Sequence, residues 1–350
     1  MKTLVTGAAG LIGSAVARAL LAEGREVRAL AHSRDNRNLA GLEVEVVQGD
    51  LLDPDSLARA LQGCDKLHHL ASIYAHWHPK GGDFIRRVNI EGTRNILEAA
   101  SKCGLEKIIH TSSISAVGFY PDRLSAEEDY PREEDLRRQP YRESKFRSEL
   151  IAREWAKKLP IVIVNPASPI GVGDWLPTAT GRTILDFLNG KMFAYVDAGL
   201  NVIDVEDLAL GFVAAEKKGR VGERYILGNQ NILLKDFFAA IAELTGLAPP
   251  RVKMPRAVVR MVAEVNEVIA DIIKKEPLAA VEQALHLRYK EFVDCSKAVR
   301  ELGLPQNDFR IAIAKAVKYY LDIGAVKPER ARLIKLQEPA AVREQAPGTT

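Results

Sequence analysis

The sequence predicts an α/β protein in which a doubly wound parallel sheet is followed by a smaller, mixed C-terminal lobe. Short β-rich runs alternate with helix-like segments through about the first 170 residues, which is the pattern of βαβ units. Glycines interrupt the chain between the first strand and the first helix, as in Rossmann-type folds. Beyond residue 170 the alternation decays. We therefore expect a first domain over residues 1–170, a second lobe over 171–325 and a tail over 326–350.

The charge of the chain is nearly balanced. Its 49 lysines and arginines against 46 aspartates and glutamates give a formal net charge of +3. Binding to a nucleic acid would require a concentrated basic patch, for which this balance gives no support. We expect no nucleic-acid partner.

Cysteine usage and hydropathy indicate the compartment. Cys64, Cys103 and Cys295 are far apart and none forms a Cys-x-x-Cys pair, which argues against a disulfide framework and a zinc site. Glycines and Arg18 interrupt the apolar N-terminal stretch that resembles a signal peptide. No run reaches the roughly eighteen apolar residues that a membrane span needs. We expect a cytoplasmic protein with no membrane span.

The first glycine-rich turn is a candidate phosphate-binding loop. The β-rich run 2–6 precedes glycines at positions 7, 10 and 13, and a helical alanine and leucine pattern continues to Glu23. A strand, a glycine turn and a helix in this order direct free backbone N–H groups and a helix dipole at a phosphate. The spacing differs from the commonest dinucleotide fingerprint, so a plain tight turn is the alternative. The cofactor-binding residues expected here are Gly7, Gly10, Leu11, Ile12 and Gly13.

The end of the second strand, 26–31, bears on the choice of cofactor. An acid there holds the adenosine ribose of NAD, while a basic group suits the 2′-phosphate of NADP. His32 and Arg34 follow the strand, and no acid comes before Asp35. The sequence therefore favours NADP and leaves NAD open, although both side chains could also be solvated loop residues.

Two further strands, 44–47 and 66–70, are expected to end beside the cofactor. After the first of them, Asp50 can reach an adenine amine or can serve as a turn residue. A helix follows over 54–61. After the second strand, a short loop is well placed to pass under the cofactor. The cofactor-binding residues expected in this part of the chain are Asp50, Leu51, Leu70, Ala71 and Ser72.

Five histidines raise the question of a metal site: His68, His69, His76, His78 and His110. No helical pair at ligand spacing and no nearby acid accompanies them, so we expect no metal. The aperiodic aromatic segment 73–82 follows the carboxyl end of a strand. It could form part of a substrate wall, or it could serve packing alone.

The candidate catalytic pair is Tyr141 and Lys145, at the start of a helix predicted over 141–158. Four residues apart on a helix, the two side chains lie on one face about one turn from each other. An ammonium beside a phenol favours the phenolate, so Tyr141 is a candidate acid and base near neutral pH. Taken alone, the same spacing is common on solvated helix faces.

Two other polar residues are candidates for the same site. Asn89 lies within a helix predicted over 83–103, where a buried amide must bond to the backbone or to a water. Ser113 ends the strand 107–110 after two other hydroxyl residues, and its hydroxyl could hold a substrate oxygen or cap a helix.

A sixth strand, 161–164, leads into the loop 165–174, whose prolines and glycines fix its shape. The second lobe is expected to close the site from one side. Its predicted helices are 183–188 and 205–217, with further helix after residues 235, 255 and 276, and its predicted strands are 193–196 and 224–227.

The ordered set of these residues gives the chain a family resemblance. With Gly7, Gly10, Gly13, Asp50, Asn89, Ser113, Tyr141 and Lys145 in that order, it resembles an extended short-chain dehydrogenase/reductase of the NAD-dependent epimerase/dehydratase family. Within that family it is similar to hopanoid-associated sugar epimerases and dihydroflavonol-reductase-like proteins. Four segments carry the more specific part of the resemblance. The first is Asn-Pro-Ala-Ser-Pro-Ile-Gly at 165–171, and the other three are residues 177–182, 194–197 and 201–208.

The resemblance implies a role for each site residue. Tyr141 would donate and accept the proton at a substrate oxygen that Ser113 holds, and Lys145 would bind the nicotinamide ribose and lower the pKa of the tyrosine. Asn89 would help to hold the site together. Pro166 and Ser168 would lie against the nicotinamide, which supplies the hydride.

The resemblance leaves two enzymatic functions open. One is an NAD(P)-dependent oxidoreductase that acts on a small molecule, and the other is a sugar epimerase with no net cofactor turnover. The segment 184–203 is fairly apolar, and the second lobe shows no arginine arrangement suited to a nucleotide diphosphate, which favours a reductase or dehydrogenase. A non-catalytic dinucleotide sensor is a remote third reading. The family also implies a homodimer built from the helices 83–103 and 141–158.

Overall fold

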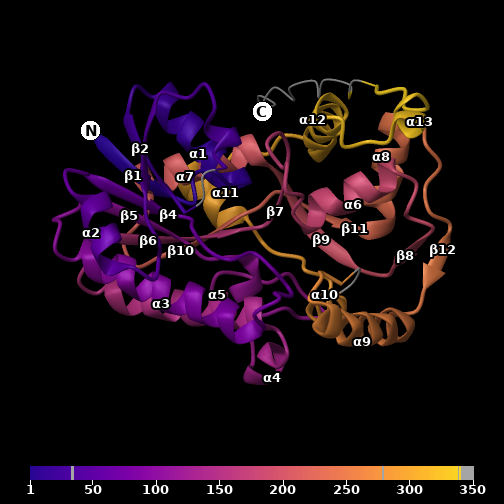
Figure 1. Ribbon diagram of the computed structural model, residues 1–350, viewed down its shortest axis with the longest axis horizontal. Helices are drawn as coiled ribbons and strands as arrows, with labels where there is room; N and C mark the ends of the chain where they lie inside the picture. The colour runs from indigo at the N-terminus through magenta and orange to yellow at the C-terminus, as the bar shows by residue number, and fades with distance from the viewer. Residues whose placement is uncertain (33–34, 278–279, 338, 340–350) are drawn as a thin grey trace, which may run out of the picture.

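The doubly wound parallel sheet predicted from the sequence is confirmed by the computed structural model, which describes residues 1–32, 35–277, 280–337 and 339. Its strand order is β10-β6-β5-β4-β1-β2-β3, and every neighbouring pair is parallel (Figure 1). The chain leaves β1 in one direction and later returns to pair on its other side. This reversal opens a crevice at the carboxyl ends of the strands. The strands are β1 (Lys2–Thr6), β2 (Glu26–Ala31), β3 (Val44–Gln48), β4 (Lys66–His69), β5 (Lys107–Thr111), β6 (Ile161–Pro166) and β10 (Arg224–Leu227).

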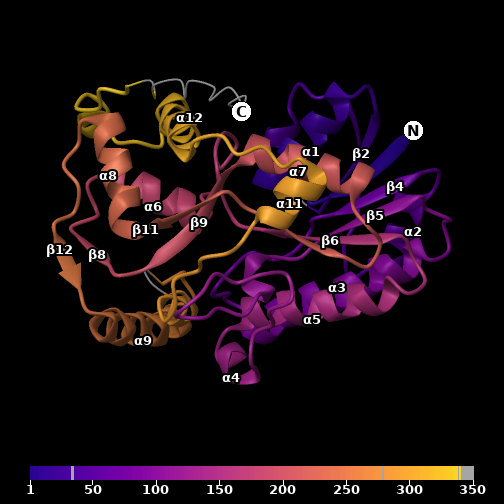
Figure 2. The same ribbon diagram turned by 180° about the vertical axis from the view of Figure 1, so that it is seen from behind.

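Helices cover both faces of this sheet, as Figures 1 and 2 show. Helices α2, α3 and α5 lie on one face, and α1, α7 and α11 lie on the other. Each face has its own apolar core, with Val16 and Phe212 buried in one and Leu57 and Ile96 in the other. The helices are α1 (Leu11–Ala22), α2 (Pro54–Leu61), α3 (Gly82–Ala100), α5 (Pro140–Trp155), α7 (Val205–Lys218) and α11 (Ser296–Leu302).

Strand β10 corrects one expectation. The sequence placed 224–227 in the second lobe, but this strand pairs with β6 in the main sheet, with Tyr225 opposite Val164. Helix α7 carries the chain back from the second lobe to the sheet, which no local pattern reveals. The division of the chain near residue 170 otherwise stays a prediction.

The second lobe is mixed and smaller, as expected. It contains a three-stranded sheet in the order β11-β9-β7 and a two-stranded parallel sheet of β12 and β8. Its core includes Phe187, Phe237, Phe238 and Ile313. Its elements are β7 (Ser168–Ile170), α6 (Ala179–Leu188), β8 (Ala194–Val196), β9 (Gly199–Asp204), β11 (Gln230–Leu233), α8 (Leu234–Thr245), β12 (Val252–Met254), α9 (Arg256–Ile273), α10 (Val281–His286) and α12 (Phe309–Asp322).

The remaining elements are short: the 3₁₀ turns η1 (Arg37–Leu39) and η2 (Ile114–Ala116), and the helices α4 (Glu133–Leu136) and α13 (Pro328–Ala331). Helix α13 falls in the segment expected to be a tail, and residues 340–350 lie outside the described part of the chain. No helix among the described residues is long and apolar enough to cross a membrane.

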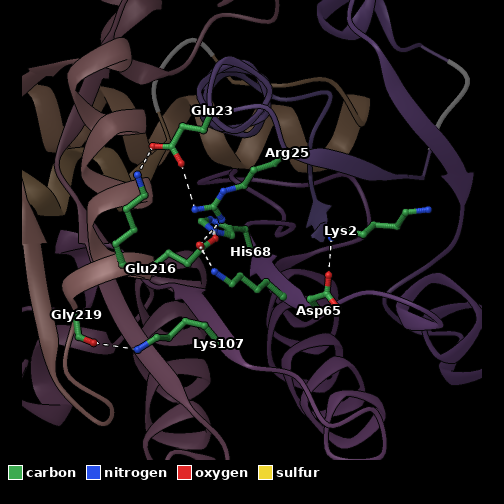
Figure 3. Close-up of polar contacts among 10 residues, drawn as sticks. Lys2, Glu23, Arg25, Asp65, His68, Lys107, Glu216 and Gly219 are labelled. Atoms are coloured by element: carbon green, nitrogen blue, oxygen red, sulfur yellow. Dashed lines mark hydrogen bonds and ion pairs between the residues drawn. The ribbon is translucent and has the colours of Figure 1, made fainter.

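A buried carboxylate ties α7 to the amino-terminal edge of the sheet (Figure 3). Glu216 accepts hydrogen bonds from Arg25, from Lys66 at 2.8 Å and from His68 at 2.8 Å. Burial alone would raise the pKa of Glu216, but these three donors hold it well below its usual range. His68, one of the five candidate metal ligands, thus has a structural partner far from the carboxyl ends of the strands.

We predict that Glu216→Gln lowers the free energy of unfolding by about 3 kcal/mol, because it leaves buried cationic donors without their anion. Urea denaturation at neutral pH measures this loss. The matched control is Glu23→Gln, since Glu23 joins the same group through Arg25 and Lys217 but is partly exposed. We expect that control to cost less than about 1 kcal/mol, and equal losses in the two variants would contradict the assignment.

Candidate active site

A cavity of about 1400 Å³ lies at the carboxyl ends of the parallel strands and is bounded by both lobes. Its lining contains nearly every site residue predicted from the sequence. Asn89 lies outside the lining, and Arg34 lies outside the described residues. The predicted residues that line it are Gly7, Gly10, Leu11, Ile12, Gly13, His32, Asp50, Leu51, Leu70, Ala71, Ser72, Ser113, Tyr141, Lys145, Pro166 and Ser168. Their location is thereby established, and their individual roles stay predictions.

The glycine turn forms a close-fitting cradle at the start of α1. Gly7 has φ of +70°, and a Cβ there would lie 2.9 Å from the backbone of Ala71. A Cβ on Gly13 would lie 2.2 Å from the carbonyl oxygen of Gly7. No side chain caps the N-terminus of α1, so its backbone N–H groups are free to bind an anion in the cavity. These features fit the pyrophosphate of a dinucleotide.

The adenosine end of the cavity lies beside the ends of β2 and β3. His32 is exposed, and its Nε2 lies 3.4 Å from a carboxylate oxygen of Asp50. The other oxygen of Asp50 accepts a hydrogen bond from the Leu52 N–H at 2.8 Å, so this residue also serves as a turn residue. Asp35, the first acid after β2, is held by two hydrogen bonds from Arg37 at 3.0 and 2.7 Å. Asp35 is not among the described residues that line the cavity.

Lys145 is a buried cation directed at the sheet. Its Nζ donates a hydrogen bond to the carbonyl oxygen of Thr111 at 2.7 Å. Burial lowers its pKa to about 8, and the charge of Glu149 opposes that shift only in part. The ammonium is therefore the main form at neutral pH, but it titrates within reach of ordinary assay conditions.

Tyr141 is also buried, at the first turn of α5 and beside Ser113. Burial is the main cause that raises the pKa of its phenol, and the neighbouring Tyr74 adds to the effect, while a hydrogen bond with Ser113 opposes it. That Lys145 lowers the pKa of this phenol stays a prediction. In a desolvated site the neutral phenol, the form that carries a transferable proton, is favoured over the phenolate.

Glu149 fixes α5 against the ends of three strands. It is fully buried one turn after Lys145, and it accepts hydrogen bonds from Ser112 at 2.5 Å and Asn165 at 2.8 Å. Its other oxygen lies 2.7 Å from Nε of Arg224 on β10. Asn165 also donates to the carbonyl oxygen of Ser113 at 2.9 Å. The same group of contacts therefore positions both the helix of Tyr141 and the backbone of Ser113.

Asn89 uses its amide to hold the site together. Its side chain accepts a hydrogen bond from the Ile73 N–H at 2.7 Å and donates to the Ile73 carbonyl at 3.0 Å. It also donates to the hydroxyl of Ser144 on α5 at 2.9 Å. The expected hydrogen bond between this buried amide and the backbone is therefore present. Asn89 is thus a positioning residue that joins α3, the loop after β4 and α5.

The second lobe reaches the same helix through Glu282 on α10. The two carboxylate oxygens of this buried residue accept hydrogen bonds from the N–H groups of Tyr141 at 3.2 Å and Arg142 at 2.9 Å. A carboxylate at this position satisfies free donors in the first turn of α5 and interacts favourably with its dipole. Interactions with His286 and His76 hold the pKa of Glu282 at about 2, although burial acts in the opposite direction.

His76, Glu282 and His286 form one group, with their possible ligand atoms all within 4.8 Å of one another. The Nδ1 of His286 lies 2.9 Å from Glu291. Burial by itself would lower the pKa of His286, but the carboxylates of Glu291 and Glu282 raise it to about 9. The imidazolium and the two carboxylates therefore make an ion-paired group at neutral pH. The expectation of no metal stays a prediction.

The other candidate histidines have separate environments. His69 contacts the hydroxyl of Thr6 at 2.9 Å, and burial lowers its pKa to about 3. Burial also holds the pKa of His110 well below its usual value. His76 and His78 line the cavity together with Tyr74, so the aromatic segment after β4 does form part of the cavity wall.

Several cavity residues escaped sequence reasoning: Asn36, Arg182, Phe237, Gln283, His286 and Glu291. Glu282 lies 141 positions after Tyr141, and α10 is too short for a strong periodic pattern. No local signal could have joined these segments to the catalytic helix.

Comparisons with known proteins identify a matching family and several similar proteins. The model of the family described as the NAD dependent epimerase/dehydratase family matches residues 3–228. A putative dihydroflavonol 4-reductase from Synechocystis sp. is 40% identical over 332 residues, which cover 93% of this chain and 96% of that protein. Sterol demethylase protein B from Methylococcus capsulatus is 34% identical over 334 residues, which cover 93% of this chain and 100% of that protein. A crystal structure described as a nucleoside-diphosphate-sugar epimerase from Pseudomonas aeruginosa is 28% identical with a TM-score of 0.77, over 93% of this chain and 99% of that one.

The pKa of Lys145 gives a test of its part in cofactor binding. Because that pKa is about 8, the ammonium loses its proton as the pH rises through this value. We predict that the affinity for NADPH, measured by fluorescence titration, is constant well below pH 8 and falls as the pH rises through it. Lys145→Met should bind roughly tenfold more weakly at neutral pH, a loss of about 1.4 kcal/mol, and should lack the pH step.

Lys80→Met is the matched control, since Lys80 also lines the cavity but is exposed. It should keep the wild-type pH profile. A step of the same size in Lys145→Met would show that another group causes it.

Proposed function

This chain belongs to the NAD-dependent epimerase/dehydratase family, and from that premise we propose that it is an oxidoreductase acting on an apolar, ring-containing ketone or alcohol. The observation that carries the proposal is the presence of Tyr141 and Ser113 together in the lining of a cavity whose second-lobe part includes a group of apolar side chains among polar ones. A buried, protonated phenol beside a hydroxyl is suited to give a proton to a carbonyl oxygen.

The residues present fit a nicotinamide dinucleotide. The glycine turn and the N-terminus of α1 would hold its pyrophosphate, Lys145 would bind the nicotinamide ribose, and Pro166 and Ser168 would lie against the ring. When bound, the reduced dinucleotide supplies a hydride. NADP is the proposed cofactor rather than NAD, because Arg37 already neutralises Asp35 at the end of β2.

The chain's own part in the reaction is proton transfer and positioning. In the direction of reduction, the hydroxyl of Ser113 holds the substrate carbonyl oxygen, and the Tyr141 phenol donates its proton to that oxygen as the carbon gains a hydride. The resulting alkoxide charge is thereby neutralised, and a hydrogen bond from Ser113 would stabilise the phenolate left on Tyr141. A proton from solvent restores the phenol. Oxidation of an alcohol reverses each step.

The substrate class follows from the second lobe's share of the cavity. Its lining includes Met192, Leu200, Leu234, Phe237 and Leu287. Arg182 is the sole arginine among the described lining residues, whereas a nucleotide diphosphate is typically bound by several charged donors. The names of two relatives, a dihydroflavonol reductase and a sterol demethylase protein, point to ring systems of the same kind.

A sugar epimerase is the second candidate. Its support is the similarity to the Pseudomonas aeruginosa structure, together with Arg182 in the cavity. The two candidates differ in cofactor turnover, because an epimerase oxidises and reduces the same substrate molecule. Two further features of the protein also remain proposals: a cytoplasmic location, and a homodimer formed through α3 and α5.

The test is net NADPH oxidation by the purified chain with dihydroflavonol and sterol ketones. We predict that one NADPH is consumed for each carbonyl reduced, and that Tyr141→Phe lowers kcat by about 10²–10⁴-fold, the contribution of a positioned general acid. The Kd for NADPH should change little, since the substitution removes only a hydroxyl. Absorbance of NADPH and product analysis measure both quantities.

A protein that retains NAD through desalting and interconverts nucleotide sugars without net cofactor use would overturn the proposal in favour of the epimerase. Unchanged turnover of a reducible ketone by Tyr141→Phe would overturn the assignment of the proton donor while leaving the redox reaction in place.

A further inference from the structure

Helix α9 exposes its apolar side chains. Six of them are between 50% and 76% exposed: Met261, Val265, Val268, Ile269, Ile272 and Ile273. Within the helix, only Ala263 and Ala270 are buried. With 3.6 residues per turn, the six side chains form one continuous face along the whole helix. A surface helix normally turns such a face toward the core, so α9 has the opposite orientation.

The polar side of α9 is the side attached to the protein. The side chain of Asp271 accepts a hydrogen bond from the indole of Trp77 at 2.8 Å. Glu267 accepts one from the N–H of Val281 at 2.7 Å. The guanidinium of Arg256 donates to the carbonyl of Asp197. These contacts fix the rotation of α9 about its own axis. The apolar face of the helix therefore points toward solvent.

Two further exposed apolar side chains lie on the strand pair that precedes α9. Strand β12, which leads into α9, pairs with β8. Val252 on β12 is 57% exposed, and Phe193, directly before β8, is 72% exposed. A large set of exposed apolar side chains such as the face of α9 marks an interaction site in a folded protein.

This surface adjoins the substrate end of the cavity. In Figure 1, α9 and α10 lie side by side at the lower edge of the second lobe. From α10 and the residue after it, His286 and Leu287 line the cavity. The segment that carries Trp77, which is bonded to α9, also contributes His76 and His78 to the lining. A partner bound to α9 is thus next to both segments that bound the site on this side.

We propose that α9 docks on the surface of a lipid bilayer that contains anionic lipids, and that an apolar substrate passes from the bilayer into the adjoining cavity. The proposal rests on the function proposed above. The apolar face would enter the boundary between headgroups and acyl chains, while the polar side of α9 keeps its contacts with the protein, as in interfacial helices.

Charge favours a bilayer over a second copy of this chain. Exposed basic residues flank both ends of α9, with Arg251 before its start and Lys274 and Lys275 after its end, where one acid, Glu276, follows them. Two copies packed face to face would bring like charges together in either a parallel or an antiparallel arrangement. Anionic headgroups are attracted to both ends.

The test is flotation with lipid vesicles of phosphatidylcholine, with and without phosphatidylglycerol. We predict that the wild-type chain floats with the vesicles, more strongly when phosphatidylglycerol is present. The double variant Val265→Glu/Ile272→Glu should reduce binding at least about tenfold, because it places two charges in the acyl boundary. Leu210→Glu is the matched control, since Leu210 is 50% exposed but lies on α7 in the other lobe, and it should bind as the wild type does.

Activity separates this proposal from the proposed function. The double variant should keep wild-type NADPH-dependent reduction of a water-soluble ketone and show a KM raised about tenfold for a sterol ketone presented in vesicles. Wild-type protein that stays with the aqueous fraction would overturn the docking site even if the reductase activity is found. The wild-type chain could instead form a dimer that does not bind vesicles and that Val265→Glu/Ile272→Glu converts to a monomer. That result would assign the apolar face of α9 to a second copy of the chain.

Discussion

The buried carboxylate of Glu149 is the interaction on which the geometry of the site depends. It draws together Ser112 at the end of β5, Asn165 at the end of β6 and Arg224 on β10. A charge this deep is stable only with its partners in place, because an unpaired buried ion costs several kcal/mol. The requirement works in both directions: the strand ends fix α5, and α5 fixes the strand ends. Tyr141, Lys145 and Ser113 acquire their relative positions from this one arrangement.

A second carboxylate couples the lobes. Glu282 on α10 binds the first turn of α5 through two backbone N–H groups, and His76 and His286 lie next to its carboxylate. The helix that carries the catalytic pair is therefore held from the sheet at its middle and from the second lobe at its start. A movement of α10 would therefore act directly on the hydrogen bonds at the N–H groups of Tyr141 and Arg142. A surface that binds through α9 would thus act on the same lobe that shapes the substrate end of the cavity.

The sequence predicted the sheet and most of the cavity because their signals are local. Gly7 and Gly13 mark a turn where a Cβ does not fit, and the spacing of Tyr141 and Lys145 places both on one face of α5. What it missed depends on contacts distant along the chain. Strand β10 joins the sheet only because α7 recrosses it, and Glu282 meets α5 through the fold of the second lobe. The pKa of Tyr141 also depends on burial, which the spacing of two residues cannot reveal.

The most direct measurement of the central claim is a crystal structure of the protein with NADPH bound. We predict the pyrophosphate at Gly10 and the N-terminus of α1, and the nicotinamide between Pro166 and Tyr141, with the hydroxyls of Tyr141 and Ser113 facing the same side of the ring. Retention of the Glu149 contacts in that complex is part of the prediction. A nicotinamide bound away from Tyr141 and Ser113, with α5 in the same position, would contradict the assignment of this cavity as a redox site.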